Sequence, residues 1–384
     1  MFASRTQWNL KPNRLAEALE RHKSSGRRLL DLSASNPTEC GFIYDAPAIM
    51  RALCAPASLQ YHPDPKGLRS ARQSVSDYYA DHGERVAIDD LILTASTSEA
   101  YSFIFRLLCN PGDELLIPTP GYPLFDFLAD VNDAKLIRYP LFYDHGWHID
   151  VHALKQAITP RTRGIIVVHP NNPTGHFTRL GETAQLNQIC AEHRIAIIAD
   201  EVFLDFSLDA TQKSFAANAG ALTFTMSGVS KISGLPQMKF AWLAVSGPQD
   251  IKREALARLE MIADTYLSLN APIQLAAPVL LRTRARFQQQ IMDRVRTNLA
   301  ELDSQLARNP DVTRLVVEGG WYAVLRVPVT LQDEELAVKL LQEHDVYLHP
   351  GHFYDFPGDG YVVVSLITPE EHFREGLLRV LPAI

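Results

Sequence analysis

The sequence predicts an α/β fold with a mainly parallel seven-stranded sheet, followed by a smaller α+β domain. Two observations lead to this prediction. Short apolar runs rich in β-branched residues recur between residues 91 and 247, and helix-like stretches separate several of them. Continuous apolar strands that alternate with helices are typical of a parallel sheet with both faces covered. After about residue 250 this alternation stops, which indicates a second unit.

The expected strands are 91–96, 113–120, 134–141, 163–170, 194–203, 221–227 and 239–247, with helices at 98–109 and 180–193 between them. In the second unit a long helical stretch is expected over 250–307, then apolar runs at 315–328 and 360–367, and a final helix at 370–381. We expect a large domain over 46–280. Segments 1–45 and 281–384 would together form the small domain.

Composition excludes several classes of protein. The chain has 384 residues and a net charge of −7, so it lacks the basic footprint of a nucleic-acid-binding protein. It contains no apolar stretch long enough to cross a membrane, and its first residues lack the apolar core of a signal peptide. The cysteines Cys40, Cys54, Cys109 and Cys190 are scattered, which indicates free thiols in the cytoplasm and neither a disulfide frame nor a zinc site.

Polar clusters stand near the ends of expected strands. Ser96, Thr97 and Ser98 lie at a strand-to-helix junction, where hydroxyls and free N–H groups suit a phosphate. The alternative is a simple helix cap with Glu99 in the first turn. Asn172 follows another strand in the Pro/Gly turn PNNPTG (170–175), which can direct its amide into a crevice or can be an ordinary loop.

Asp200 and Lys231 are the two charged candidates. Asp200 ends the most apolar strand, in ADEVF (199–203), where a buried acid needs a cationic or hydrogen-bonded partner. The alternative is a cap on the next helix. Lys231 stands in SGVSKISGLPQMKFAW (227–242), among small hydroxyl and glycine residues. A lysine that forms a Schiff base must be desolvated and tightly placed, and such surroundings provide this.

In this order the four clusters resemble the motif set of the fold-type I pyridoxal phosphate enzymes, specifically the class I/II aminotransferases. The resemblance extends over nearly the whole chain. It also includes LSASNPT (32–38), YHPDPKGLRSARQSVSDYY (61–79), NPGDELLIPTPGYP (110–123) and EGLLRVL near the C-terminus.

The resemblance implies pyridoxal 5′-phosphate as the cofactor, with Lys231 as the Schiff-base lysine and proton shuttle. Asp200 would keep the pyridine nitrogen protonated, so that the ring acts as an electron sink. The remaining implied cofactor contacts are Asn172 on the ring hydroxyl, Tyr122 on the ring face, Ser96, Thr97 and Ser98 on the phosphate, and Ser227 or Ser230 near it. Tyr61 would reach the phosphate of a partner subunit, which implies a homodimer with shared active sites.

Two departures from the family concern the cofactor. The family has an arginine on the phosphate eight residues after the lysine, and here that position is Lys239. A lysine keeps the charge but loses the bidentate fork. The family also has a tyrosine three residues after the aspartate, where this chain has Phe203. Loss of that donor to the ring hydroxyl is expected to raise the pKa of the Schiff base.

Other departures concern the substrate. The family's arginine for the substrate α-carboxylate corresponds to Val363 in GYVVVSL, and a usual glycine in the N-terminal substrate loop is Ser35, beside Asn36. Either another cation binds the carboxylate, or the substrate lacks one there. The candidate replacements are Arg5, Arg14, Arg282, Arg284 and Arg326, each of which can equally be a solvated surface charge. His349 and His352 match a segment near the substrate entrance, and a metal site there is not expected.

The first functional hypothesis is an aminotransferase that acts on an amino donor and an oxo-acid acceptor. A second is another reaction of the same cofactor: β-elimination, decarboxylation or oxidative deamination, which the changes at Val363 and Phe203 motivate. A third is a binding or regulatory protein without turnover, against which the joint presence of Lys231, Asp200 and Asn172 argues. A nicotinamide-dependent dehydrogenase is disfavoured, because no GxGxxG follows a strand.

Overall fold

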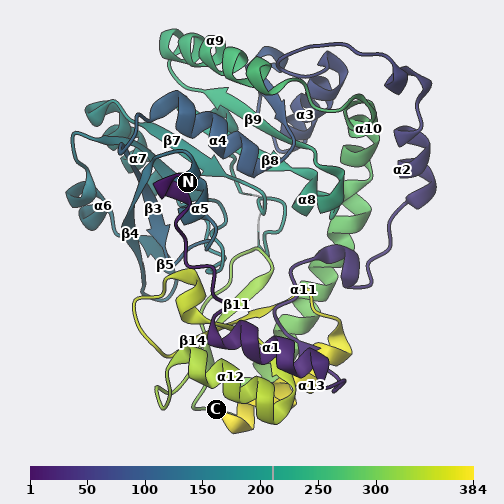
Figure 1. The fold of residues 1–384 in the computed structure, drawn as a ribbon, viewed down its shortest axis with the longest axis vertical. Coiled ribbons are helices and arrows are strands. Elements are labelled where there is room, and N and C mark those ends of the chain that lie inside the picture. The colour runs from purple at the N-terminus through teal and green to yellow at the C-terminus, as the bar shows by residue number, and fades with distance from the viewer. Residues whose placement is uncertain (210–211) are drawn as a thin grey trace.

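The computed structural model describes residues 1–209 and 212–384, and an eight-stranded sheet forms the centre of its larger part (Figure 1). The strand order is β2-β9-β8-β7-β6-β3-β4-β5. Their bounds are β2 Leu91–Thr94, β3 Glu114–Thr119, β4 Lys135–Tyr143, β5 Trp147–Ile149, β6 Thr162–Val168, β7 Ala196–Asp200, β8 Thr223–Gly228 and β9 Ala241–Ser246. All seven expected strands occur in it. The structure adds β5, a three-residue strand too short to give a sequence pattern.

Most neighbours in this sheet are parallel. The pairs β4–β3, β3–β6, β6–β7 and β7–β8 run parallel, whereas β9 is antiparallel to both β2 and β8, and β5 is antiparallel to β4. The carboxyl ends of the parallel strands therefore open on the same edge of the sheet. In such sheets the ligand crevice lies at this edge.

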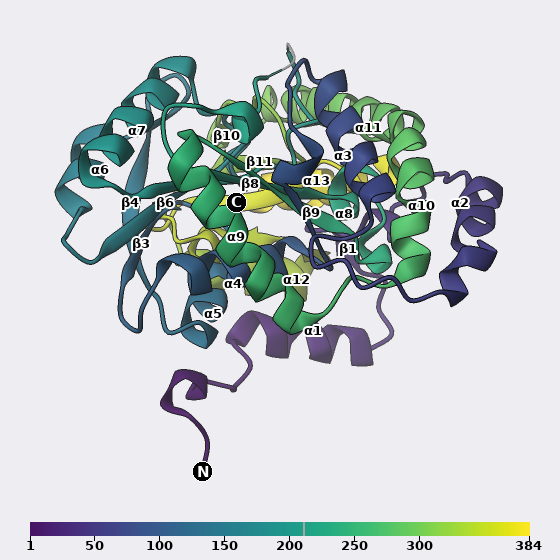
Figure 2. The same ribbon diagram turned by 90° about the horizontal axis from the view of Figure 1, so that it is seen from above.

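Helices cover both faces of the sheet (Figure 2). Ile166 and Ile198 pack with α4 (Thr97–Leu108), α5 (Phe125–Val131) and α9 (Gln249–Tyr266) on one side. Ile165 and Ile197, their neighbours along the strands, pack with α6 (Val151–Ala157) and α7 (Leu180–His193) on the other. Successive side chains of a strand point to opposite faces, so continuous apolar runs are what a sheet covered on both sides requires.

A third apolar cluster lies towards the β2 and β9 edge. It unites Leu91 and Trp242 with helices α3 (Arg69–Asp81), α8 (Val229–Ile232) and α10 (Ala271–Arg282). Helix α2 (Ala46–Leu53) packs against α10. The single helical stretch expected over 250–307 is thus three helices, α9, α10 and α11 (Arg284–Leu306). Asn270 caps α10 through its side chain, which begins a new helix there.

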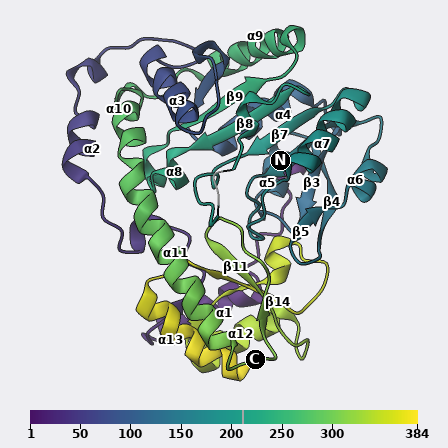
Figure 3. The ribbon, with the colours of Figure 1, turned by 180° about the vertical axis from the view of Figure 1, so that it is seen from behind.

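The smaller sheet has the order β10-β11-β14-β13 and is antiparallel throughout. Its bounds are β10 Thr313–Arg314, β11 Tyr322–Arg326, β13 His349–Pro350 and β14 Tyr361–Ser365. The N-terminal segment joins this part of the fold, because β1 (Leu30–Asp31) pairs with β12 (Val346–Tyr347). The helices here are α1 (Arg14–Ser24), α12 (Asp333–His344) and α13 (Glu370–Val380), with α11 running down from α10 (Figure 3).

No helix of the described ranges combines the length and the apolar character that a membrane crossing needs.

Gly234 follows α8 and has a backbone φ of +63°, and a methyl group on its Cα would overlap the Phe287 ring. We expect Gly234→Ala to lower the free energy of unfolding by about 1–3 kcal/mol more than Gly26→Ala does, because overpacking adds to backbone strain. Gly26 is the matched control, with φ of +71° and open space around it. Urea unfolding followed by circular dichroism measures both, and equal losses would contradict the packing argument.

Candidate active site

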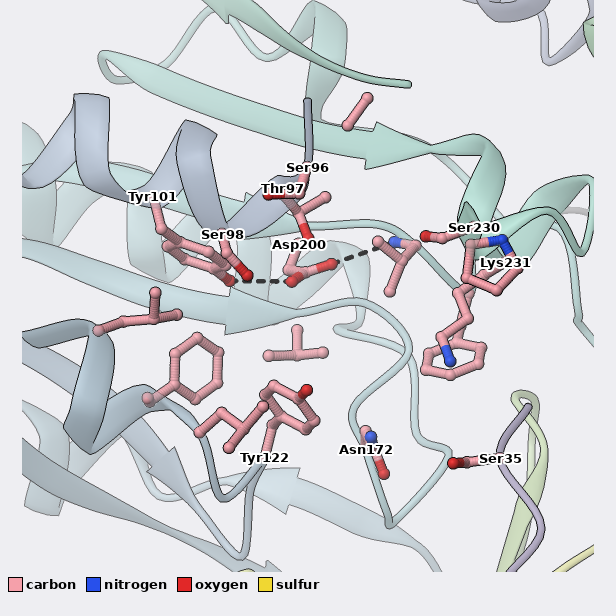
Figure 4. Close-up of a pocket in the computed structure, with 18 of the residues that line it drawn as sticks. Ser35, Ser96, Thr97, Ser98, Tyr101, Tyr122, Asn172, Asp200, Ser230 and Lys231 are labelled. Atoms are coloured by element: carbon pink, nitrogen blue, oxygen red, sulfur yellow. Dashed lines mark hydrogen bonds between the residues drawn. The ribbon is translucent and has the colours of Figure 1, made fainter. Parts of the chain in front are cut away.

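A cavity of about 410 Å³ opens at the carboxyl edge of the large sheet (Figure 4). Its walls come from the N-terminus of α4, the loop after β6, the end of β7 and helix α8. Residues of the smaller sheet and its following turn line the opposite side. Among the predicted site residues, those that line it are Ser35, Ser96, Thr97, Ser98, Tyr122, Asn172, Asp200, Ser230, Lys231 and Lys239. Residues from positions 35 to 239 thus meet in one space.

Asp200 is the buried acid at the end of β7. Its Oδ2 accepts a hydrogen bond from the Tyr101 hydroxyl at 3.0 Å, and its Oδ1 accepts one from the Val202 N–H at 3.1 Å (Figure 4). Burial raises the pKa of Asp200 to about 6, although both donors and Lys231 act in the opposite direction. A carboxylate in this state gains from a cationic partner in the cavity.

Lys231 lies on α8, the four-residue helix between β8 and β9. The backbone around it is fixed from several sides: Val229 N–H donates to Phe240 O, Tyr44 donates to Gly234 O, and Gln288 donates to Ile232 O. Burial lowers the pKa of Lys231 to about 8, with Asp200 opposing the shift. The amine is therefore partly neutral near physiological pH, as a nucleophile or base requires.

Two aromatic rings flank the Lys231 amine. Its Nζ lies 5.0 Å from the ring centre of Trp321 and 5.5 Å from that of Phe203. The two rings meet edge to face, 5.2 Å apart. Phe203 thus presents an apolar ring at the position where the family's tyrosine would add a hydroxyl.

The N-terminus of α4 provides the candidate anion site. Ser96 caps this helix, its Oγ accepting from Glu99 N–H at 3.1 Å, so the cap reading is confirmed, and the phosphate reading stays a prediction. Thr97 and Ser98 follow in the first turn, and Lys239 lines the same cavity. Backbone N–H groups, hydroxyls and an ammonium group are what a phosphate binds.

Asn172 and Tyr122 lie on the remaining walls. Asn172 is buried, and its Oδ1 has no hydrogen-bond partner in the described part of the chain. Buried amides are normally paired, so this atom is available to a ligand. Tyr122 packs edge to face on Phe125 at 5.7 Å and presents the rest of its ring to the cavity (Figure 4).

Three predicted residues lie elsewhere. Ser227 is fully buried in β8, and its hydroxyl donates to Glu201 O at 3.3 Å, so Ser230 is the serine at the cavity. Asn36 lines an adjoining opening next to Lys231, with its side chain engaged by Thr38. Tyr61 is 72% exposed and does not reach the cavity of its own chain.

The sequence reasoning missed several lining residues. Tyr101 lies one helical turn into α4, where only its position after the Ser/Thr cluster gave a signal. Tyr322 and Tyr354 come from the small-sheet side together with His349. Tyr322 stands in the apolar run expected at 315–328, and both tyrosines are buried. Their role as walls depends on how the two sheets face each other.

None of the five candidate arginines lines this cavity. Arg5 pairs with Asp133, and Arg284 pairs with Asp81. Arg282 lines a separate depression beside Tyr44, Arg14 is exposed at the start of α1, and Arg326 lies over the rings of Tyr143 and Tyr361. Among the described residues no group of three or more His, Cys, Asp or Glu side chains is placed to hold a metal ion.

Comparison with known proteins identifies the family. Residues 27–374 match the model described as "Aminotransferase class I and II", and the chain belongs to this family. The glutamate-pyruvate aminotransferase AlaA of Escherichia coli K12 is 32% identical over 267 residues, which are 68% of this chain and 65% of that protein. The alanine aminotransferase of Mycobacterium tuberculosis is 28% identical over 355 residues, 89% of this chain and 82% of that one.

Solved structures agree in fold. An aminotransferase from Escherichia coli superposes with a TM-score of 0.87 at 25% identity, covering 100% of this chain and 97% of that chain. The alanine aminotransferase from Pyrococcus furiosus reaches 0.90 at 22% identity, covering 100% and 99%, and shares the fold. The chain therefore has the fold of its family, fold type I, and the enzymes of this family depend on pyridoxal 5′-phosphate.

The cavity fits this cofactor. The N-terminus of α4 and Lys239 would hold the phosphate, Tyr122 the ring face, and Asp200 the ring nitrogen, while the unpaired amide of Asn172 would meet the ring hydroxyl. When bound, the cofactor supplies a ring that withdraws electrons from the substrate. Asp200 would keep a proton on the ring nitrogen, and the Lys231 amine would move a proton at the substrate α-carbon.

We expect Tyr101→Phe to shift the acidic limb of the pH–rate profile to higher pH. The Tyr101 hydroxyl lowers the pKa of Asp200, so its removal raises that pKa further above the ordinary value. A higher pH is then needed to ionise the carboxylate. Stopped-flow rates of cofactor conversion across pH measure the limb. Tyr139→Phe, which loses a buried hydroxyl bonded to Ile166 O, is the control; equal shifts in both variants would contradict the assignment.

Proposed function

We propose that this protein is an aminotransferase that moves an amino group from an amino acid to a 2-oxo acid, with Lys231 and Asp200 as its catalytic residues. The observation that carries the proposal is the meeting of these two residues in one cavity, with Lys231 buried on α8 and Asp200 at the end of β7. A buried lysine with a pKa of about 8 suits both attachment of the cofactor and proton transfer.

The substrates are proposed from relatives. Two relatives that match this chain are named glutamate-pyruvate aminotransferase and alanine aminotransferase. The chain spans 65% of the length of the first of these. Alanine and glutamate are therefore the first amino donors to test, and their oxo acids the first acceptors.

A second candidate is another reaction of the same cofactor, such as β-elimination, decarboxylation or oxidative deamination. One specific observation favours it: no arginine lines the described cavity. An arginine clamp fixes which bond of the α-carbon stands perpendicular to the ring, so a different anchor can select a different bond.

We also propose a compartment and a domain division for the enzyme. We place it in the cytoplasm, which the four free cysteines support. We divide it into a large domain of 46–280 and a small domain of 1–45 with 281–384, which the break between α10 and α11 near Thr283 supports.

We also propose a homodimer in which Tyr61 reaches the partner's phosphate site. Exposed Leu59 and Tyr61 on one segment support this arrangement. Sedimentation equilibrium is expected to give twice the mass of the 43.0 kDa chain. A monomer at micromolar concentration would contradict it.

The decisive experiment mixes cofactor-loaded protein with single amino donors in the absence of acceptor. We expect alanine or glutamate to convert the cofactor to its amine form with one equivalent of oxo acid released. Lys231→Ala is expected to slow the conversion of the cofactor by about 10²–10⁴-fold, which is the usual contribution of a general base. Lys213→Ala, a lysine outside the cavity, is the control.

The products separate the alternatives. Release of ammonia or carbon dioxide, with the cofactor returned unchanged, would replace the aminotransferase with the second candidate. Protein that binds no pyridoxal phosphate at all would overturn both.

A further inference from the structure

We propose that His349 binds the carboxylate of the amino-acid substrate and thereby determines the preference for amino acids over simple amines. The inference rests on the aminotransferase function proposed above, and it assigns the substrate anchor that the arginines do not supply.

The charges of the cavity lead to this residue. Its lysines are Lys231 and Lys239, and its carboxylate is Asp200, and all three are assigned above to the cofactor. In the described part of the chain no arginine lines it. A substrate carboxylate that enters this space must find a hydrogen-bond donor or a cation, because an unpaired buried carboxylate is strongly unfavourable. His349 is the remaining lining side chain that can take a positive charge.

The position of His349 suits this task. It lies on β13 directly opposite Val363 of β14, so the two side chains share one face of the small sheet. Val363 is buried and apolar and offers nothing to a carboxylate. His349, on the neighbouring strand, therefore places a polar group on the same face of the sheet, where Val363 provides none.

Tyr354 orients the imidazole. Its hydroxyl lies 2.9 Å from Nδ1 of His349, and the ring centres are 5.9 Å apart. With the phenol donating to Nδ1, Nε2 carries the hydrogen and has no hydrogen-bond partner among the described residues. A hydrogen bond to one ring nitrogen determines which nitrogen of a histidine carries the hydrogen. Nε2–H is then the donor for the substrate.

The groups around His349 make its charge responsive to an anion. Burial lowers its pKa, and the Asp31 carboxylate on the β1 side acts in the opposite direction. The other groups packed against it are Tyr347 of β12, Phe353 and Tyr354 of the turn after β13, and Val363. The free imidazole is therefore neutral at pH 7.

An incoming carboxylate raises the pKa of His349, so the ring takes up a proton on binding. His349 thus has a lower pKa without the carboxylate than with it. Between these two pKa values, the affinity for the carboxylate falls as pH rises.

The test compares donors with and without a carboxylate. In cofactor-loaded enzyme, His349→Gln is expected to raise the half-saturating concentration of alanine by about 10–100-fold, a loss on the scale of a charged hydrogen bond. It should leave that of ethylamine within about twofold. His352→Gln, an exposed histidine three residues on, is the matched control. Equal effects of His349→Gln on alanine and ethylamine would overturn the inference.

A second readout does not depend on turnover. Propionate, an unreactive carboxylate, is titrated into the loaded enzyme by calorimetry in two buffers of different ionisation enthalpy. Wild-type protein is expected to take up a proton for each propionate bound near pH 7.5, and His349→Gln is expected to take up none. Identical proton uptake in both would overturn the assignment even if the variant were less active.

Rescue distinguishes a specific anchor from a structural one. Val363→Arg, placed opposite position 349, is expected to restore alanine affinity in the His349→Gln background and to remove its pH dependence. Circular dichroism would show whether His349→Gln fails to fold. In that case Tyr354→Phe, which removes only the hydroxyl bonded to His349 Nδ1, tests the same assignment with a smaller change. If wild-type enzyme converts no amino acid but binds propionate with proton uptake, the proposed function fails while the His349 assignment stands.

Discussion

The amine of Lys231 lies inside the protein, beside the rings of Phe203 and Trp321 and in the field of the Asp200 carboxylate. Burial of an ammonium group is unfavourable, so the surroundings of this side chain must be fixed well enough to keep it there. The short helix α8 is held through its backbone by Phe240, Tyr44 and Gln288, which belong to three separate parts of the chain. The large sheet, the N-terminal segment and α11 thus converge on one lysine.

Desolvation acts on both charged groups with opposite sign. It lowers the pKa of Lys231 towards 8 and raises that of Asp200 towards 6, so the two values approach each other across neutral pH. The Tyr101 hydroxyl and the Val202 N–H limit the shift of Asp200. A lysine that can lose its proton and an aspartate that can keep its charge are the two states that this chemistry requires together.

The small sheet contributes the other half of the cavity. Tyr322 and Ser35 are hydrogen-bonded to each other, and Tyr354 holds His349. The first contact joins the N-terminal segment to β11, whereas the second lies within β13 and the turn that follows it. The small-sheet side of the cavity is therefore built from hydroxyl and imidazole groups, whereas the large-sheet side carries its two lysines and its carboxylate.

Much of the fold and of the cofactor side could be predicted from the sequence. The seven apolar runs became strands because a strand buried on both faces has to be apolar along its length. Their positions at strand ends made Asn172 and Asp200 candidates, small neighbours made Lys231 one, and the resemblance to the family gave all three their expected roles. These signals are local, since the carboxyl ends of parallel strands meet at one edge whatever the loops do. Lys239 and Phe203 could be recognised as departures without coordinates because the resemblance to the family implies a different residue at each position.

The tertiary structure alone decided the rest. Whether Ser227 or Ser230 faces the cavity depends on where β8 ends, and Ser227 is still inside the sheet. The partnership of Tyr101 with Asp200 joins residues 99 positions apart. The pairing of His349 with Val363 is a matter of strand register, and a one-residue slip would turn either side chain to the opposite face. Sequence determines which groups are available, whereas long-range packing determines which of them meet.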